Sequence, residues 1–122
     1  MLPAKYDITV YQGDTFRLPI TLSMKDAEEN VTPVDLTDQH LKAQIRQRQN
    51  PDAGLMGTFE FVMLNPEQGS FEAVLPAEES ANVFRNGFWD LETTDLSTGE
   101  VRTWIYGQVT VLPQVTVWSQ DL

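Results

Sequence analysis

Apolar and polar residues alternate with a period of two along most of this chain. Residues 16–24 show the alternation most clearly, because every second side chain is apolar and those between are polar or proline. Residues 41–46, 59–63, 71–75 and 101–111 repeat it. Such a pattern is typical of a half-buried β-strand that turns one face toward a core. It therefore predicts β-structure through most of the sequence.

Short turn-forming segments separate these runs. In segment 12–14, Gly13 can supply the positive φ of a tight hairpin turn, and segments 86–87 and 97–99 have similar turn chemistry. Pro19 cannot donate a ladder hydrogen bond, so its strand is expected to lie at a sheet edge or to carry a bulge there. Seven short, regularly spaced strands predict an all-β sandwich or barrel. We expect these strands at residues 5–11, 15–24, 41–48, 57–64, 70–75, 87–94 and 100–112.

Two segments depart from the alternation. Residues 76–85 begin with a proline and two glutamates that suit a first helical turn, so we expect a short helical piece at the corner between two sheets. Residues 25–40 are polar and show no clear period, which indicates a long connection. A chain of 122 residues is expected to form one domain. We place the β-sandwich domain at 1–113 and a strand-like arm at 114–122.

Charge and cysteine content narrow the classes of function. The net charge is −10, and it is uneven: residues 1–50 carry seven acids and six bases, whereas residues 51–122 carry eleven acids and two bases. Such a surface repels phosphate backbones and anionic lipids, so we expect neither nucleic acid nor a membrane as a partner. The chain has no cysteine and no apolar run long enough to span a bilayer. We expect a soluble protein that folds in a reducing cytoplasm.

Few residues offer catalytic or metal-binding chemistry. His40 is the only histidine, and without cysteine it cannot form a zinc site or a plausible triad. Asp90 and Glu92 share one strand face about 7 Å apart and are the one pair of carboxylates that would suit a small hydrolase. Calcium would require convergence of acids from several segments, and no calcium-loop motif is present. Those acids are Asp35, Asp38, Asp90, Glu92 and Asp95. We expect no enzyme activity, cofactor or metal.

Aromatic residues on the last strand are the first candidate contact surface. Trp104 and Tyr106 have the opposite parity to Ile105 and Val109, so we expect them to face away from the inward set. Outward aromatics can bury against another protein or stack on a sugar. They can also pack within a twisted sandwich, and all three interpretations stay open.

The segment after Pro113 is the second candidate. It keeps the alternation of a strand, with Val115 and Val117 on one face and Thr116 and Trp118 on the other. Such a segment can complete its own sheet, or it can pair with the edge of a neighbouring protein and anchor there through the tryptophan. We therefore predict that Val115, Val117 and Trp118 bind a partner, together with Trp104 and Tyr106.

The order of several short motifs over residues 6–112 resembles a group of short bacteriophage proteins. These are similar to the N-terminal β-sandwich domain of siphophage baseplate upper proteins and to related tail or neck accessory proteins. The resemblance rests on Tyr11-Gln12-Gly13-Asp14, Asp35-Leu36-Thr37, Ala43-Gln44-Ile45-Arg46, Gly69-Ser70-Phe71, Leu75-Pro76-Ala77-Glu78-Glu79 and Gly87-Phe88-Trp89-Asp90-Leu91-Glu92. It implies a seven-stranded Ig-like antiparallel β-sandwich without catalytic residues, and it does not cover the segment after Pro113.

The resemblance also implies a place in a virion. We expect a structural adaptor in the tail, baseplate or neck that docks other phage proteins and is present in several symmetric copies. The acidic residues 51–122 would then face a basic partner. The alternative is a carbohydrate-binding module that presents Trp104 and Tyr106 to a host glycan.

Overall fold

The computed structural model describes residues 3–116. Strands account for 55% of the described residues and helix for 6%, so the predicted all-β class is confirmed. In chain order the elements are β1 (Ala4–Lys5), β2 (Ile8–Tyr11), β3 (Phe16–Thr21), β4 (Ser23–Lys25), β5 (Val31–Pro33), β6 (Gln39–Arg46), β7 (Leu55–Thr58), β8 (Glu60–Asn65), η1 (Pro66–Gln68), β9 (Ser70–Leu75), α1 (Ala77–Ser80), β10 (Gly87–Asp95) and β11 (Val101–Leu112).

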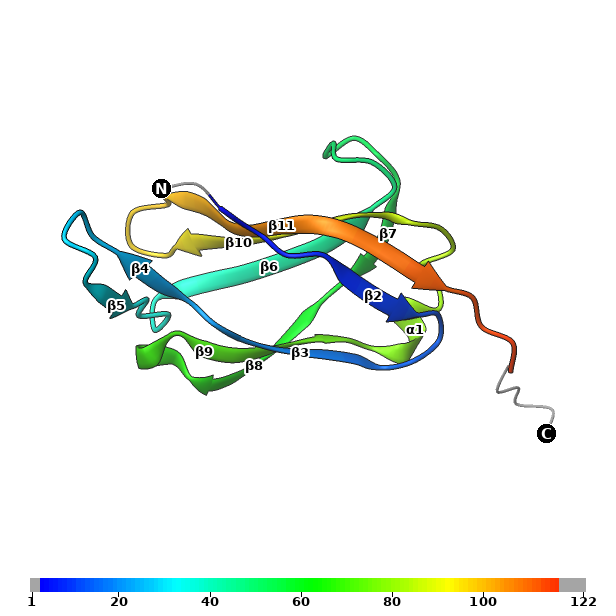
Figure 1. Ribbon diagram of the computed structural model, residues 1–122, viewed down its shortest axis with the longest axis horizontal. Helices are drawn as coiled ribbons and strands as arrows, with labels where there is room; N and C mark the ends of the chain where they lie inside the picture. The colour runs from blue at the N-terminus through cyan, green and yellow to red at the C-terminus, as the bar shows by residue number, and fades with distance from the viewer. Residues whose placement is uncertain (1–2, 117–122) are drawn as a thin grey trace.

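Two facing sheets form the body of the molecule (Figure 1). The larger sheet has the order β1-β11-β10-β6-β7, and β2 also pairs with β11. The smaller sheet has the order β3-β9-β8, which places β3 and β8 at its two edges. A separate ribbon of β4 and β5 extends one end of the structure (Figure 1). The result is a β-sandwich-like arrangement with open sheets.

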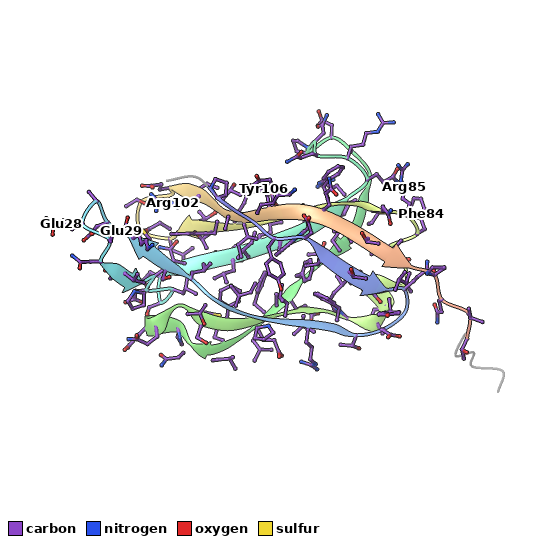
Figure 2. The ribbon with its side chains drawn as sticks, viewed as in Figure 1. Glu28, Glu29, Phe84, Arg85, Arg102 and Tyr106 are labelled. Atoms are coloured by element: carbon purple, nitrogen blue, oxygen red, sulfur yellow. The ribbon has the colours of Figure 1, made fainter. Side chains whose placement is uncertain are left out.

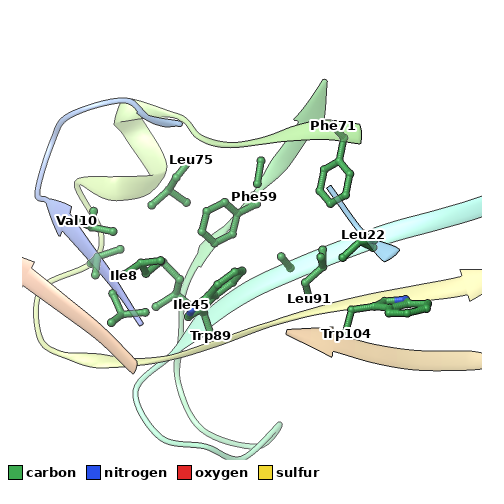
Figure 3. Packing of buried hydrophobic residues seen from close by; sticks show 14 of the residues in the cluster. Ile8, Val10, Leu22, Ile45, Phe59, Phe71, Leu75, Trp89, Leu91 and Trp104 are labelled. Atoms are coloured by element: carbon green, nitrogen blue, oxygen red, sulfur yellow. The ribbon is translucent and has the colours of Figure 1, made fainter. Parts of the chain in front are cut away.

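The core lies between the two sheets, and both contribute to it (Figure 3). Phe59 lies near its centre, with its ring centroid 5.8 Å from that of Trp89 and 6.4 Å from that of Phe16. Three residues outside the two sheets are also buried: Leu22, between β3 and β4, and Val34 and Leu36, between β5 and β6. The largest fully buried side chains include Phe71, Leu36, Ile45, Leu75 and Leu91.

At two of the places where the chain crosses between the sheets, the crossing is a short break. The first is the turn at Gly13, whose positive φ of 89° agrees with the prediction. The predicted hairpin is wrong, however, because β2 and β3 join different sheets and do not pair with each other. The backbone N–H of Gly13 donates to Ser80 Oγ at 3.0 Å, and this hydroxyl donates to the carbonyl of Asp14 at 2.6 Å. The second break is Phe59, whose N–H donates to the carbonyl of Ala43 on β6 at 3.0 Å. Each crossing is thus held by hydrogen bonds to a neighbouring element.

Residues 3–116 contain eleven strands where the sequence predicts seven. The predicted strand at 57–64 divides at Phe59, because its two halves belong to different sheets. The predicted strand at 15–24 divides at Leu22 for a similar reason. The polar stretch 25–40 was predicted as a connection, yet it contributes β5 and the start of β6. The predictions of a strand at 70–75 and of an edge position for Pro19 are confirmed.

The helical piece predicted at 76–85 is shorter in the structure. Only Ala77–Ser80 is helical, and residues 81–86 continue as turns and bends. Val83 is fully buried and closes one end of the core, whereas Phe84 is 62% exposed beside Arg85 (Figure 2). No helix in the described part of the chain is long and apolar enough to cross a membrane.

Candidate functional site

The outer face of the large sheet carries a set of polar and aromatic side chains. Strand pairing sets their order: Asp90 on β10 lies between Gln44 on β6 and Tyr106 on β11. One pleat along, Phe88 pairs with Arg46. Side chains two residues apart on a strand share a face, so Phe88, Asp90 and Glu92 all point to this side. Figure 2 shows Tyr106 on the same outer face.

The loop between β6 and β7 rises from the large sheet (Figure 1), and residues of this loop help to line a hollow on the outer face. Arg46 holds the loop, because its Nη1 donates to the carbonyl of Ala53 at 2.8 Å. A second hydrogen bond, from Gln47 N–H to the carbonyl of Gly54 at 3.0 Å, closes the loop. The hollow has a volume of about 340 Å³, in the size range of small-ligand pockets. It is lined by Lys42, Ala43, Gln44, Arg46, Arg48, Gln49, Asn50, Pro51, Phe88, Trp89, Asp90, Glu92 and Tyr106.

Asp90 is the carboxyl group most affected by this environment. Partial burial raises its pKa, the negative charge of Glu92 adds to the rise, and the guanidinium of Arg46 opposes it. Arg46 also donates to Gln44 Oε1 at 3.0 Å. Asp90 and Glu92 line the same hollow, as their shared strand face predicted.

The five acids considered for calcium do not converge. Asp90 and Glu92 line the hollow on the large sheet, whereas Asp35 and Asp95 line a different hollow of about 250 Å³. Within residues 3–116 no group of three or more His, Asp or Glu side chains could hold a metal ion. The predicted possibility of convergence is therefore wrong.

Two of these carboxylates act as local turn caps. Asp95 Oδ1 accepts hydrogen bonds from Ser97 Oγ at 2.7 Å and from Ser97 N–H at 2.9 Å, and these bonds lower the pKa of Asp95 to about 2. Asp35 accepts from the hydroxyl and the backbone N–H of Thr37, which also lowers its pKa. Both carboxylates are thus committed to the loops that contain them.

Trp104 does not face away from the core, and this part of the sequence prediction is wrong. Leu91 pairs with Ile105 but Glu92 pairs with Thr103, so β11 has one extra residue at Trp104. Such a bulge breaks the strict alternation of faces on a strand. Trp104 is only 9% exposed, and its Nε1 donates to Thr93 Oγ1 at 2.8 Å. Its ring lies 5.1 Å from the guanidinium carbon of Arg102.

The other predicted contact residues do not lie together. Tyr106 is half-buried on the outer face of the large sheet and lines its hollow. Val115 is 93% exposed, and residues 113–116 form no strand. Val117 and Trp118 lie outside the described residues. Tyr106 and Val115 therefore do not belong to one continuous surface on the large sheet.

One exposed apolar segment was missed as a site by the sequence analysis. Strand β8 is an edge of the small sheet, and it exposes Val62, Met63 and Leu64 to solvent. The signal in the sequence was the run Phe61-Val62-Met63-Leu64, which is apolar on both faces of the strand rather than on one. A strand with only one buried face should alternate, so this run indicated an extra apolar surface.

Comparison with known proteins gives no relative on which to base a function, since the sequence matches no protein-family model and no curated protein is significantly similar to it. The function is therefore argued from the residues, the fold and the resemblance described above.

Proposed function

We propose that this chain is a non-enzymatic structural adaptor of a bacteriophage particle, located in the tail, baseplate or neck. The observation that carries the proposal is the segment after β11, which leaves the sandwich with Val115 almost fully exposed although its sequence alternates like a strand. An exposed, strand-like segment is suited to pairing with a neighbouring protein.

Three further features support an adaptor. The two facing sheets agree with an Ig-like sandwich, which the resemblance to baseplate upper proteins implies. The net negative charge of residues 51–122 favours a basic partner surface. The carboxylates Asp35 and Asp95 are occupied as turn caps. In this proposal, partner contacts come from the segment 114–122, with Trp118 as its anchor.

The experiment is to purify particles of the phage or prophage that encodes the chain. Mass spectrometry should detect the chain at a fixed ratio to a tail or neck protein, and immunogold labelling should place it at one site on the particle. Particles made with the chain truncated after Pro113 should lack it, because an arm provides both ladder hydrogen bonds and an aromatic anchor. Absence of the intact chain from washed particles would contradict the proposal.

A second candidate function is the recognition of a host glycan, and the hollow on the large sheet favours it. Tyr106 and Phe88 provide ring surfaces there, and Gln44, Asp90 and Glu92 provide polar groups around them. A glycan array separates the two functions. An adaptor should give no signal with millimolar sugar, whereas a lectin should give one that Tyr106→Ala abolishes and Thr110→Ala, on an exposed site of β11, preserves.

A further inference from the structure

We propose that the free edge of β8 receives residues 114–122 of a second copy of this chain, so that the protein assembles with itself by strand addition. This inference rests on the arm in the proposed function and adds the surface that the arm binds. It joins two features of the chain: an unprotected sheet edge and a strand-like segment that forms no strand in the described part of its own fold.

The two edges of the small sheet differ in their protection. Natural edge strands resist pairing through charges, proline or short length. On β3, Pro19 lacks an N–H, and Arg17 forms an ion pair with Glu72 at 2.8 Å on the outer face. On β8, by contrast, no lysine, arginine or proline interrupts the strand, and its one charged residue, Glu60, stands at its start. Its pairing with β9 is regular from Glu60 to Met63 and shifts register only between Met63 and Asn65, and Val62 within the regular part is 47% exposed. β8 is therefore the edge of this sheet that is open to another strand.

Partly buried apolar side chains lie along β8 and along the free part of β6. On the other sheet, β7 pairs with β6 only from Gln44 to Arg46, so the first half of β6 is an edge as well. Leu41 on that half and Phe61 on β8 are partly buried and pack against the core. Met63, on the same face of β8 as Phe61, is 40% exposed. A strand added to β8 would cover these side chains with every second residue.

The segment 114–122 matches both faces of this edge. Val115 and Val117 share one parity and would lie on the side of Phe61 and Met63, whereas Trp118 has the other parity and would lie on the outer side with Val62. The segment carries no lysine or arginine that would be desolvated there. The alternation of the arm thus fits a strand edge that is apolar on both sides.

A second copy fits this pairing better than the same chain does. The arm leaves β11 beside the turn at Gly13, where Gln114 N–H donates to Gln12 Oε1 at 3.2 Å. That turn leads into β3, two strand spacings from β8. To cross about 10 Å at about 3.3 Å per residue, the arm would use about three residues before it could pair. Val115 would then lie in the crossing segment and could not pair with β8 of its own molecule. An arm from another molecule could pair with β8 along its whole length.

The test uses two complementary variants of the purified chain. One is truncated after Pro113 and keeps the edge without the arm; the other, Val62→Lys with Leu64→Lys, keeps the arm and charges the edge. Intact chain should sediment as a dimer or larger species at about 100 μM, while each variant alone should sediment as a monomer. Mixed together, the two variants should form a heterodimer, because one intact arm then meets one intact edge.

The control is Thr21→Lys, an exposed position on the protected edge β3, which should associate like the intact chain. Circular dichroism melts confirm that each variant is folded. Association by the lysine variant equal to that of the intact chain would overturn the inference. So would an intact chain that stays monomeric at this concentration. If that monomer is nevertheless found in purified particles, the adaptor function stands and only self-assembly fails.

Discussion

Trp104 donates its indole N–H to Thr93 Oγ1 across the two longest strands of the large sheet, inside the core. The indole N–H and the threonine hydroxyl are both polar, and both residues are buried. The hydrogen bond between them satisfies each group and so offsets the loss of its hydration. A bulge of one residue in β11 brings them together. At the scale of single residues, this hydrogen bond explains why an aromatic residue of apparently outward parity belongs to the core.

Thr93→Val removes the acceptor and leaves a buried N–H without a partner. We expect the free energy of unfolding to fall by about 1–3 kcal/mol in urea denaturation, because an unsatisfied buried donor loses its hydration without compensation. The control Thr110→Val, at an exposed position of β11, should change it by less than about 0.5 kcal/mol. In a Trp104→Phe background the Thr93→Val change should cost clearly less, and equal costs in both backgrounds would contradict the role of the hydrogen bond.

Asp90 is the residue whose ionisation should affect stability at neutral pH. Burial and Glu92 raise its pKa above that of the unfolded chain. The folded state therefore holds the proton of Asp90 more tightly than the unfolded state does. The free energy of unfolding falls as pH rises from the unfolded-state pKa to the folded-state pKa of Asp90, and it stays at this lower value at higher pH. Asp90→Asn should therefore raise the thermal midpoint at pH 7 and bring little gain at pH 3. Asp52→Asn, at an exposed loop position, is the control.

At the scale of elements, the sequence identified strands well wherever alternation is local and unbroken. The predicted strand 70–75 coincides with β9, and the strands predicted at 87–94 and 100–112 agree closely with β10 and β11. The sequence did not identify the structure of segments that is determined by contacts between residues far apart in the chain. Val34 and Leu36 are buried by tertiary packing inside a stretch that looks polar, and no local period indicates that. The division at Phe59 likewise depends on which sheet each half joins.

The pairing of β3 with β9 provides the element-scale prediction. Ile20 pairs with Phe71, and Phe71 is fully buried in the core. Phe71→Ala should lower the free energy of unfolding by about 3–5 kcal/mol, because it leaves a cavity between the sheets. Thr21→Ala, one residue from Ile20 on the exposed face of β3, should cost less than about 0.5 kcal/mol. Similar losses for the two variants in urea denaturation would show that the faces are assigned incorrectly.

At the scale of the whole molecule, the candidate sites were only partly accessible from the sequence. The shared face of Asp90 and Glu92 followed from strand periodicity alone, because two residues on one strand need no knowledge of topology. The hollow around them did not, since it depends on the height of the loop between β6 and β7. The open edge of β8 required the order of strands in the sheet, which alternation does not contain.

Calcium provides a whole-molecule prediction, because the candidate acids are divided between two hollows. Thermal melts in EDTA and in millimolar calcium should coincide, since calcium takes several carboxylate ligands and residues 3–116 bring no three acids together in a group that could hold a metal ion. A rise of about ten degrees with calcium would correspond to a tightly held ion and would contradict this expectation.

The parallel pairing of β1 and β2 with β11 has a consequence for how the chain folds. Ile8 pairs with Val109, and the side chain of Asp7 accepts a hydrogen bond from the backbone N–H of Gln108. The first strands are therefore separated from their partner strand by about one hundred residues of sequence. During synthesis, the backbone N–H and C=O groups of β2 lack their strand partner until β11 has left the ribosome. Closing so long a loop is entropically costly and slows folding. We expect this domain to complete its fold only after β11 has left the ribosome.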